Sequence, residues 1–258
     1  MLAKKHLGQH FLNNKKILRL MCDAAELSKK DTVLEAGPGL GTLTEILEQR
    51  AKKVIAVEKD RDLIPALKEK FRNYKRVEIV EGDILVVDPP LGGRAAKSYK
   101  IVANIPYYIT SHFLRKFLGG NPPAGGKPKL MVLMIQKEVA KRIVAKDGKE
   151  SLLSLSVKAY GKPEIIRIVP RGAFSPPPKV DSAIIKIIIT PPTPLTLRGA
   201  KEEDILNLAR LAFQKKRKML RQSIGKKVNL PPQYETSRPE ELSLEDWAKI
   251  LKNGLITH

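Results

Sequence analysis

A glycine-rich turn follows the first apolar run of the chain, and turns of this kind can hold the polar groups of a ligand. Residues 35–41 read EAGPGLG and continue the short run at 32–35 into a segment with apolar residues at helical spacing. Without a Cβ, glycine permits a tight turn and lets a ligand approach the bare backbone. A tight connection that binds nothing would look similar, but the strand-then-helix context favours a ligand site. We therefore interpret Gly37, Gly39 and Gly41 as cofactor-binding residues.

Two acidic residues follow the next two apolar runs. Glu58 comes directly after the run at 54–57, and Asp83 follows the run at 77–80. A carboxylate at the first position can accept hydrogen bonds from both hydroxyls of a ribose, and one at the second can accept from the amino group of an adenine. Glu58 alone could be a solvated charge, since charged residues follow it. Together, at the ends of consecutive strands, the two acids support one cofactor pocket.

These residues need a parallel sheet to bring them together, and the pattern of the chain predicts one. Short apolar runs alternate with helical patterns such as 43–50 and 61–71, which is typical of a mostly parallel α/β sheet with helices on both faces. Parallel strands are buried on both faces, so their residues are nearly all apolar. Two later runs predict that the sheet ends in an antiparallel pair. The expected strands are 32–35, 54–57, 77–80, 101–103, 130–134, 165–169 and 183–189.

A change in the sequence pattern near residue 195 predicts a second domain. The segment 190–194 reads TPPTP, which cannot continue a strand and is typical of a stiff linker. Beyond it, helical patterns cover 202–213, 216–224 and 244–251. We therefore expect one domain at 1–194, which holds the cofactor pocket, and a second, helical domain at 195–258.

The composition favours a polyanionic partner. The 48 basic and 27 acidic residues give a net charge of +21, for which a phosphate backbone is the usual compensation and a membrane surface the rival one. No apolar run reaches the roughly 18 residues of a membrane span, and we see no secretory signal. Cys22 is the single cysteine, which fits a reducing cytoplasm, and the scattered histidines form no metal site. We expect a cytoplasmic monomer without a metal or a membrane partner.

The spacing of the glycines narrows the class of cofactor that the turn could bind. The turn reads G-x-G-x-G with an acid two residues before the first glycine, whereas a dinucleotide turn reads G-x-G-x-x-G. The form found here resembles the first motif of S-adenosylmethionine-dependent methyltransferases. That resemblance implies S-adenosyl-L-methionine as the cofactor.

The tetrapeptide NIPY, from Asn104 to Tyr107, resembles the [DNS]-[LIVP]-P-[YFW] motif of methyltransferases that act on amino groups. An exocyclic amine is a poor nucleophile because its lone pair is delocalised into the ring. The Asn104 side-chain oxygen and the Ile105 carbonyl can accept hydrogen bonds from the two N–H groups of the amine and so aim its nitrogen at the methyl group. Pro106 stiffens the turn and Tyr107 can stack on the base. The alternative is an ordinary turn with a helix-capping asparagine.

Three further segments are similar to ribosomal RNA adenine dimethyltransferases. Residues 7–12 (LGQHFL) resemble their L-G-Q-x-F-L segment, and residues 174–182 (FSPPPKVDS) resemble their F-x-P-x-P-K-V-D-S loop. Residues 212–220 (AFQKKRKML) resemble their A-F-x-x-R-R-K-x-L helix. The first arginine of that pattern is Lys216 here, and lysine lacks the planar fork with which arginine binds phosphate.

The resemblance covers nearly the whole chain and is to the family that dimethylates adenine N6 in small-subunit ribosomal RNA. It implies a Rossmann-like class I methyltransferase sheet with a small C-terminal helical domain. The implied substrate is two adjacent adenosines in the 3′-terminal hairpin of 16S rRNA, within a pre-ribosomal small subunit. The resemblance makes Phe174 a second aromatic that packs on the flipped adenine. It implies cofactor contacts from His10, Leu12, Gly37, Glu58, Asp83 and Asn104.

A basic stretch in the second domain is interpreted as the RNA-binding surface. Residues 210–227 contain eight basic residues and no acid, whereas a solvated helical face normally mixes both signs. We expect the basic set to face outward and hold RNA phosphates while apolar residues between them dock. The residues expected to bind RNA are Lys215, Lys216, Arg217, Lys218 and Arg221.

Three other functions share part of this pattern. A large-subunit rRNA adenine methyltransferase of the antibiotic-resistance type has the same cofactor and catalytic motifs, and the basic helical tail favours the small-subunit enzyme. A non-catalytic RNA-binding assembly or transcription factor could use the same fold, but the intact Glu58, Asp83 and Asn104 disfavour lost catalysis. A DNA adenine methyltransferase would normally carry a target-recognition insert, and we find none.

Overall fold

The computed structural model describes residues 4, 8–12, 14–91, 99–119, 122–123, 126–146, 148–190 and 201–254 of the chain. They fall into two compact units: the first unit is Met1–Ala140 with Glu164–Ile189, and the second unit is Lys141–Pro163 with Thr190–His258. The expected domain boundary at 194/195 lies in 191–200, outside the described residues. It stays a prediction, and the structure adds that residues 141–163 join the second unit.

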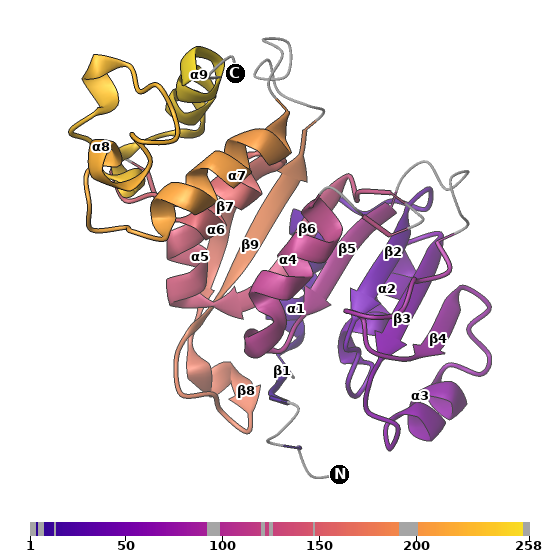
Figure 1. The fold of residues 1–258 in the computed structure, drawn as a ribbon. Coiled ribbons are helices and arrows are strands. Elements are labelled where there is room, and N and C mark those ends of the chain that lie inside the picture. The colour runs from indigo at the N-terminus through magenta and orange to yellow at the C-terminus, as the bar shows by residue number, and fades with distance from the viewer. Residues whose placement is uncertain are drawn as a thin grey trace. The chain divides into compact units, whose positions relative to one another are not determined.

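A seven-stranded sheet in the order β4-β3-β2-β5-β6-β9-β7 forms the centre of the fold (Figure 1). The pairs from β4 to β6 are parallel and β9 runs antiparallel to β6, so the predicted mostly parallel sheet is confirmed, and the two later runs form its end as neighbours β9 and β7. A separate two-stranded sheet joins β1 to β8. The strands are β1 Phe11–Leu12, β2 Thr32–Ala36, β3 Lys53–Glu58, β4 Val77–Glu81, β5 Tyr99–Asn104, β6 Leu130–Gln136, β7 Gly161–Val169, β8 Phe174–Ser175 and β9 Ser182–Ile189.

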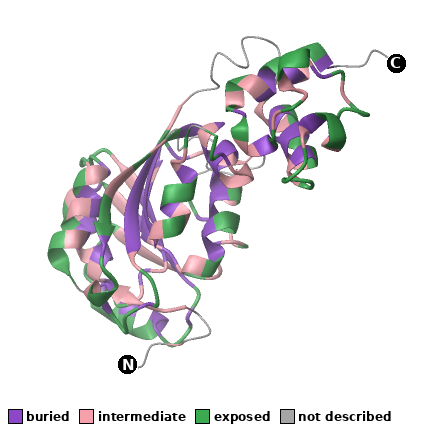
Figure 2. Ribbon diagram, turned by 90° about the vertical axis from the view of Figure 1, so that its left-hand side faces the viewer, coloured by how far each residue is buried: buried purple, intermediate pink, exposed green. Residues whose placement is uncertain are grey.

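Both faces of the central strands are buried, which is why the strand sequences are nearly continuous apolar runs. Neighbouring residues of β3 and β6 point to opposite faces, yet all of them except the end residues Lys53 and Gln136 are buried (Figure 2). Helices α1 and α2 contribute to a core cluster on one face together with Val33, Val54 and Val102. The helices of the first unit are α1 Lys15–Ala24, α2 Thr42–Arg50, α3 Ile64–Lys70, α4 Thr110–Leu118 and α5 Lys137–Ile143, of which the last continues into the second unit.

The second unit is helical, as predicted, and packs around the fully buried Trp247. Its further helices are α6 Leu152–Lys158, α7 Glu202–Phe213, α8 Leu220–Ser223 and α9 Leu244–Gly254. The expected helix at 216–224 is wrong in extent, because only α8 is helical and Met219 before it is extended (φ −62°, ψ 153°). The backbone N–H groups of Leu220 and Arg221 donate to the carbonyls of Ser237 and Glu235 at 2.8 and 3.1 Å. These long-range bonds replace the intrahelical ones that the sequence pattern favoured.

The described residues contain neither a candidate membrane span nor a candidate metal-binding cluster. None of their helices is both long and apolar enough to cross a bilayer. No group of three or more His, Cys, Asp or Glu side chains among them is placed to hold a metal ion.

The turn between β2 and α2 yields a prediction about Gly41. Its φ is +75°, and a Cβ there would lie 2.7 Å from Cε2 of Phe71. Gly41→Ala should therefore cost roughly 1–3 kcal/mol of backbone strain, as in any left-handed position, and roughly 1–3 kcal/mol more from the clash. Gly126→Ala is the matched control, because its φ is +78° and an added Cβ meets nothing within 4 Å. If denaturant unfolding gave the same loss of unfolding free energy for both variants, the ring of Phe71 would have moved aside at no cost.

Candidate active site

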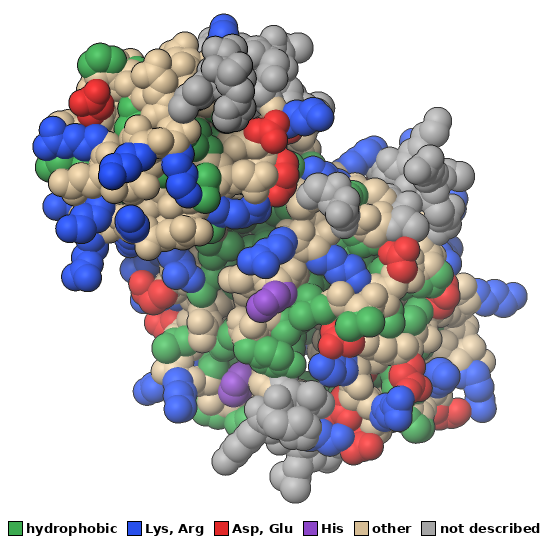
Figure 3. Space-filling model, in the orientation of Figure 1, with side chains coloured by type: hydrophobic (Ala, Val, Ile, Leu, Met, Phe, Trp, Pro, Cys, Tyr) green, Lys and Arg blue, Asp and Glu red, His purple; other side chains and the backbone are tan. Residues whose placement is uncertain are grey.

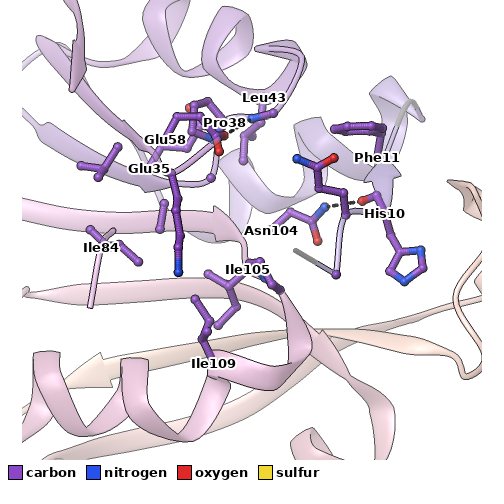
Figure 4. A pocket seen from close by; sticks show the side chains of 18 of the residues that line it. His10, Phe11, Glu35, Pro38, Leu43, Glu58, Ile84, Asn104, Ile105 and Ile109 are labelled. Carbon is purple, nitrogen blue, oxygen red and sulfur yellow. Dashed lines mark hydrogen bonds between the residues drawn. The ribbon is translucent and has the colours of Figure 1, made fainter. Parts of the chain in front are cut away.

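A pocket lies where the carboxyl ends of β2, β3, β4 and β5 meet (Figure 4). Parallel strands place their carboxyl ends at one edge, so the turns that follow these strands share one wall. The N-terminal segment 8–12 lines the pocket as well. The predicted site residues among its lining are His10, Leu12, Gly37, Gly39, Glu58, Asp83, Asn104, Ile105, Pro106 and Tyr107.

The three glycines of the turn do different things. Gly37 and Gly39 line the pocket with φ of +69° and +58°, and a Cβ on Gly37 would meet nothing within 4 Å. The backbone at Gly37 is therefore open to a ligand. Gly41 is not among the lining residues; it is the N-cap of α2 and makes room for Phe71. Its cofactor contact stays a prediction.

Glu58 is held at the end of β3 as a buried hydrogen-bond acceptor. Only 6% of its surface is exposed, which disagrees with a solvated charge. Its Oε2 accepts from the Gly39 N–H at 3.0 Å and its Oε1 from the Asp60 N–H at 2.8 Å. Burial raises its pKa, although these backbone donors oppose the shift. Each oxygen keeps a lone pair with which it can accept from a ribose hydroxyl.

A second acid, Glu35, lies beneath the same wall of the pocket. It is 1% exposed, and its Oε2 accepts from Thr44 Oγ1 at 2.7 Å. Burial raises its pKa to about 8, with a further push from the charge of Glu58. At neutral pH this carboxyl is therefore mostly protonated. Sequence reasoning used Glu35 only as a mark of the turn and missed that it is a buried lining residue.

Asp83 follows β4 and is paired with a lysine. Its Oδ2 lies 2.8 Å from Lys59 Nζ, and its Oδ1 accepts from the Leu85 N–H at 2.9 Å. Burial alone would raise its pKa, but Lys59 and the backbone donor outweigh it and hold the pKa below the usual value. Lys116 from α4 donates to the carbonyls of Ile84 and Val87 at 2.9 and 2.5 Å, which fixes the loop that carries Asp83.

The NIPY segment ends β5 and presents an amide to the pocket. Asn104 Nδ2 donates to the His10 carbonyl at 3.2 Å, which is the dashed line beside His10 in Figure 4. The amide is thereby oriented, and within the described part of the chain its Oδ1 accepts no hydrogen bond. Tyr107 is fixed by a hydrogen bond of 2.6 Å between its hydroxyl and Ser182 Oγ. Its ring also stacks on His10, with centroids 5.9 Å apart.

The N-terminal segment joins the sequence motifs to one another. Phe11 and Leu12 form β1 and pair with Ser175 and Phe174 of β8. His10 Nδ1 lies 2.8 Å from the carbonyl oxygen of Pro176, across 166 residues of sequence. The segments 8–12, 104–107 and 174–182 are therefore in contact, although only their resemblance to one family connected them in the sequence.

Besides Gly41, two groups of predicted residues are not among the lining residues of this pocket. Phe174 is 4% exposed, packs in the core with Leu12 and is not among the lining residues, so the structure does not bring it to the pocket and its role stays a prediction. The basic residues Lys215–Lys218 and Arg221 are all exposed on the second unit. With Phe213, Gln214 and Gln222, Lys215–Lys218 line a shallow hollow. Figure 3 shows Lys and Arg side chains gathered over the part of this unit that holds α8.

Tyr108 is a pocket residue that sequence reasoning missed. Its side chain lines the pocket while the residue remains 57% exposed, whereas the neighbouring Tyr107 is tied to Ser182. A second aromatic directly after the tetrapeptide was a signal present in the sequence.

Comparisons with known proteins agree with this geometry. The family model described as "Ribosomal RNA adenine dimethylase" matches residues 1–249. A "Ribosomal RNA small subunit methyltransferase A" from Dehalococcoides mccartyi is 46% identical over 96% of this chain and 87% of its own length. A protein of the same description from Alkaliphilus metalliredigens is 35% identical over 96% of this chain and 90% of its own.

Two solved structures are similar over almost the full chain. A dimethyladenosine transferase from Plasmodium falciparum has a TM-score of 0.78 and 30% identity, and the match covers 93% of this chain and 96% of the other. The 23S rRNA methyltransferase ErmE has a TM-score of 0.76 and 28% identity, with 94% and 98% covered.

The buried Glu35 predicts a pH dependence of stability. Its pKa is raised from 4.5 to about 8 in the folded chain. A raised pKa means that the folded chain keeps its proton longer than the unfolded chain does. The contribution is full below pH 4.5 and is lost as pH rises toward about 8, at on the order of 1.4 kcal/mol per pH unit. Glu35→Gln keeps the shape without the charge and should flatten this fall in denaturant unfolding. An unchanged slope in that variant would place the titration elsewhere.

Proposed function

This chain belongs to the ribosomal RNA adenine dimethylase family, and from that premise we propose that it dimethylates the N6 amines of two adjacent adenosines in the 3′-terminal hairpin of 16S rRNA. The chain is an rRNA adenine dimethyltransferase with the class I methyltransferase sheet followed by helices. The observation that carries the proposal is the Asn104 amide, oriented in the pocket by the His10 carbonyl with its oxygen unengaged among the described residues.

The residues of the pocket fit S-adenosyl-L-methionine. Gly37 leaves an open backbone, and Glu58 is a buried acceptor at the position where a ribose presents its hydroxyls. Asp83 would accept from the adenine amino group, and His10 and Leu12 would close the pocket from the N-terminal segment. When bound, the cofactor supplies an electrophilic methyl group on a sulfonium centre. Use of this cofactor is a property of the family, and these contacts are our proposal.

Positioning is the main task of the catalytic residues. The Asn104 Oδ1 and the Ile105 carbonyl would accept hydrogen bonds from the two N–H groups of the adenine amine. These bonds would localise the lone pair of the nitrogen and aim it at the methyl carbon. Held in this way, the amine nitrogen would face the methyl group that the cofactor supplies, and its surplus proton would pass to water. No strong base is needed, because a fixed amine supplies most of the effect. Tyr107, held by Ser182, offers a fixed ring for the base.

The basic surface of the second unit would hold the substrate. Lys215, Lys216, Arg217, Lys218 and Arg221 are exposed and lie in a stretch of one sign. Such a surface binds phosphates and sets the register of a structured RNA without reading its bases. We further propose that the chain works as a cytoplasmic monomer on the pre-ribosomal small subunit.

The decisive experiment compares two substrates. Labelled S-adenosyl-L-methionine is supplied with unmodified small subunits or with large subunits, and the modified bases are mapped. We expect two adjacent N6,N6-dimethyladenosines in the small-subunit RNA only. Transfer to a single adenine of large-subunit RNA would replace the proposal by the activity that the ErmE likeness suggests. No transfer to either would favour a non-catalytic assembly factor.

Asn104→Ala should abolish most methyl transfer and leave cofactor affinity nearly unchanged. The loss acts in the transition state, where the amine must be aligned, and we expect roughly a hundredfold lower kcat or more. Single-turnover transfer and calorimetric titration of the cofactor measure the two effects separately. Asn73→Ala, at an exposed position of the same unit, is the matched control and should do neither. Near-normal turnover without the Asn104 side chain would remove it from catalysis.

Neutralising Lys215, Lys216, Arg217 and Lys218 to glutamine should weaken binding to small subunits and reduce its salt dependence. The slope of log affinity against log salt should fall by nearly one for each phosphate contact that is lost. The matched control changes four exposed lysines of the first unit, Lys30, Lys52, Lys68 and Lys75, and so removes the same charge. If both variants lost affinity equally, only the total charge would matter.

A further inference from the structure

Asp60 is a buried carboxylate beside the pocket that neither the sequence motifs nor the mechanism uses. It lies two residues after Glu58 and is 4% exposed. Its side chain accepts from Lys4 Nζ at 2.6 Å, from Gln9 Nε2 at 2.7 Å and from the Asp62 N–H at 3.1 Å. Burial alone would raise its pKa, but these donors hold the pKa below its usual value, so the group is charged. Removing a donor from a buried carboxylate leaves part of its charge uncompensated, so these partners hold the group in place.

The Gln9 contact connects Asp60 to the amide that faces the substrate. Gln9 is followed directly by His10, whose carbonyl receives Asn104 Nδ2. Beyond His10, the chain is held by the β1–β8 pairing and by the contact of His10 Nδ1 with Pro176. The carbonyl that orients Asn104 therefore lies between two anchors. Asp60 supplies the one on the N-terminal side.

We propose that Asp60 is a positioning residue for methyl transfer, which acts through Gln9 and the His10 carbonyl on the orientation of Asn104. This inference rests on the proposed role of Asn104. Loss of the Gln9 anchor frees the His10 carbonyl to shift, and an acceptor misplaced by about 1 Å can cost a hundredfold in rate.

The contacts of the Asp60 side chain can be separated experimentally from the contact of its backbone N–H. Its backbone N–H binds Glu58 Oε1 at 2.8 Å, and a change of side chain leaves that bond in place. In Asp60→Asn, one of the two donors, Lys4 or Gln9, must face an amide NH2 group instead of an oxygen. The variant should therefore disturb the N-terminal segment and leave the ribose acceptor intact.

The test measures single-turnover methyl transfer to small subunits and cofactor affinity by calorimetry. For Asp60→Asn and for Gln9→Ala, we expect the rate at saturating cofactor to fall about tenfold or more, beyond any change of the cofactor Kd that follows from the place of Gln9 and His10 in the pocket lining. The double variant Asp60→Asn with Gln9→Glu reverses the hydrogen bond, because the new amide can donate to the new carboxylate. It should recover most of the rate. Asp62→Asn is the control, because it removes the charge of the other, exposed partner of Lys4 and should keep the normal rate.

The outcomes separate this inference from the function on which it rests. A wild-type chain that methylates small subunits establishes the function independently of Asp60. An unchanged rate in Gln9→Ala, or no recovery in the double variant, would overturn the positioning role. Equal losses in Asp60→Asn and Asp62→Asn would also overturn it, because they would reduce the effect to the charge of Lys4. Gln9→Ala leaves Asp60 in place and so keeps the test valid if Asp60→Asn fails to fold.

Discussion

Three carboxyl groups are buried at the ends of β2 and β3, and the surrounding wall of the pocket must compensate the cost of burying them. Glu35, Glu58 and Asp60 are 1%, 6% and 4% exposed, and a buried carboxylate is costly unless it is protonated or receives donors. The burial of each carboxyl group is compensated in a different way. Glu35 keeps its proton, Glu58 takes backbone donors from the glycine turn and from Asp60, and Asp60 takes side-chain donors from the N-terminal segment.

These solutions explain features that otherwise look unrelated. The glycine turn places the Gly39 N–H on Glu58, so the turn that leaves room for a ligand also stabilises the acceptor for it. The N-terminal segment lines the pocket, and its Gln9 donates to Asp60. The same segment then offers the His10 carbonyl to Asn104. Glu58 and Asn104 are thus connected through hydrogen bonds and the short backbone link from Gln9 to His10.

The sheet and the outline of the pocket could be predicted from sequence because each rests on local patterns. Apolar runs identify buried parallel strands, and such strands bring Gly37, Glu58, Asp83 and Asn104 to one edge. Contacts between residues far apart in sequence could not be predicted. Asp60 and Gln9 are 51 positions apart, and nothing local marks them as a pair.

The remaining differences arise where tertiary contacts decide. The expected helix at 216–224 is only α8, because donors at its start bind the carbonyls of Glu235 and Ser237. Phe174 has the residue type for a stacking partner, yet in this structure it lies in the core beside Leu12. Gly41 fits the cofactor motif, but the constraint visible on it is the ring of Phe71. Residue type and spacing do not reveal which neighbour a side chain meets.

The small β1–β8 sheet has a consequence for how the chain acquires its shape. It joins residues near the start of the chain to residues beyond position 170, and the adjoining bond from His10 to Pro176 spans 166 positions. Closing so long a loop is entropically unfavourable until the intervening strands have already been assembled. The front of the pocket is therefore a late product of folding, and during synthesis no ligand can be enclosed until most of the polypeptide has left the ribosome. An enzyme proposed to act on ribosomes thus becomes competent only after its own translation is nearly complete.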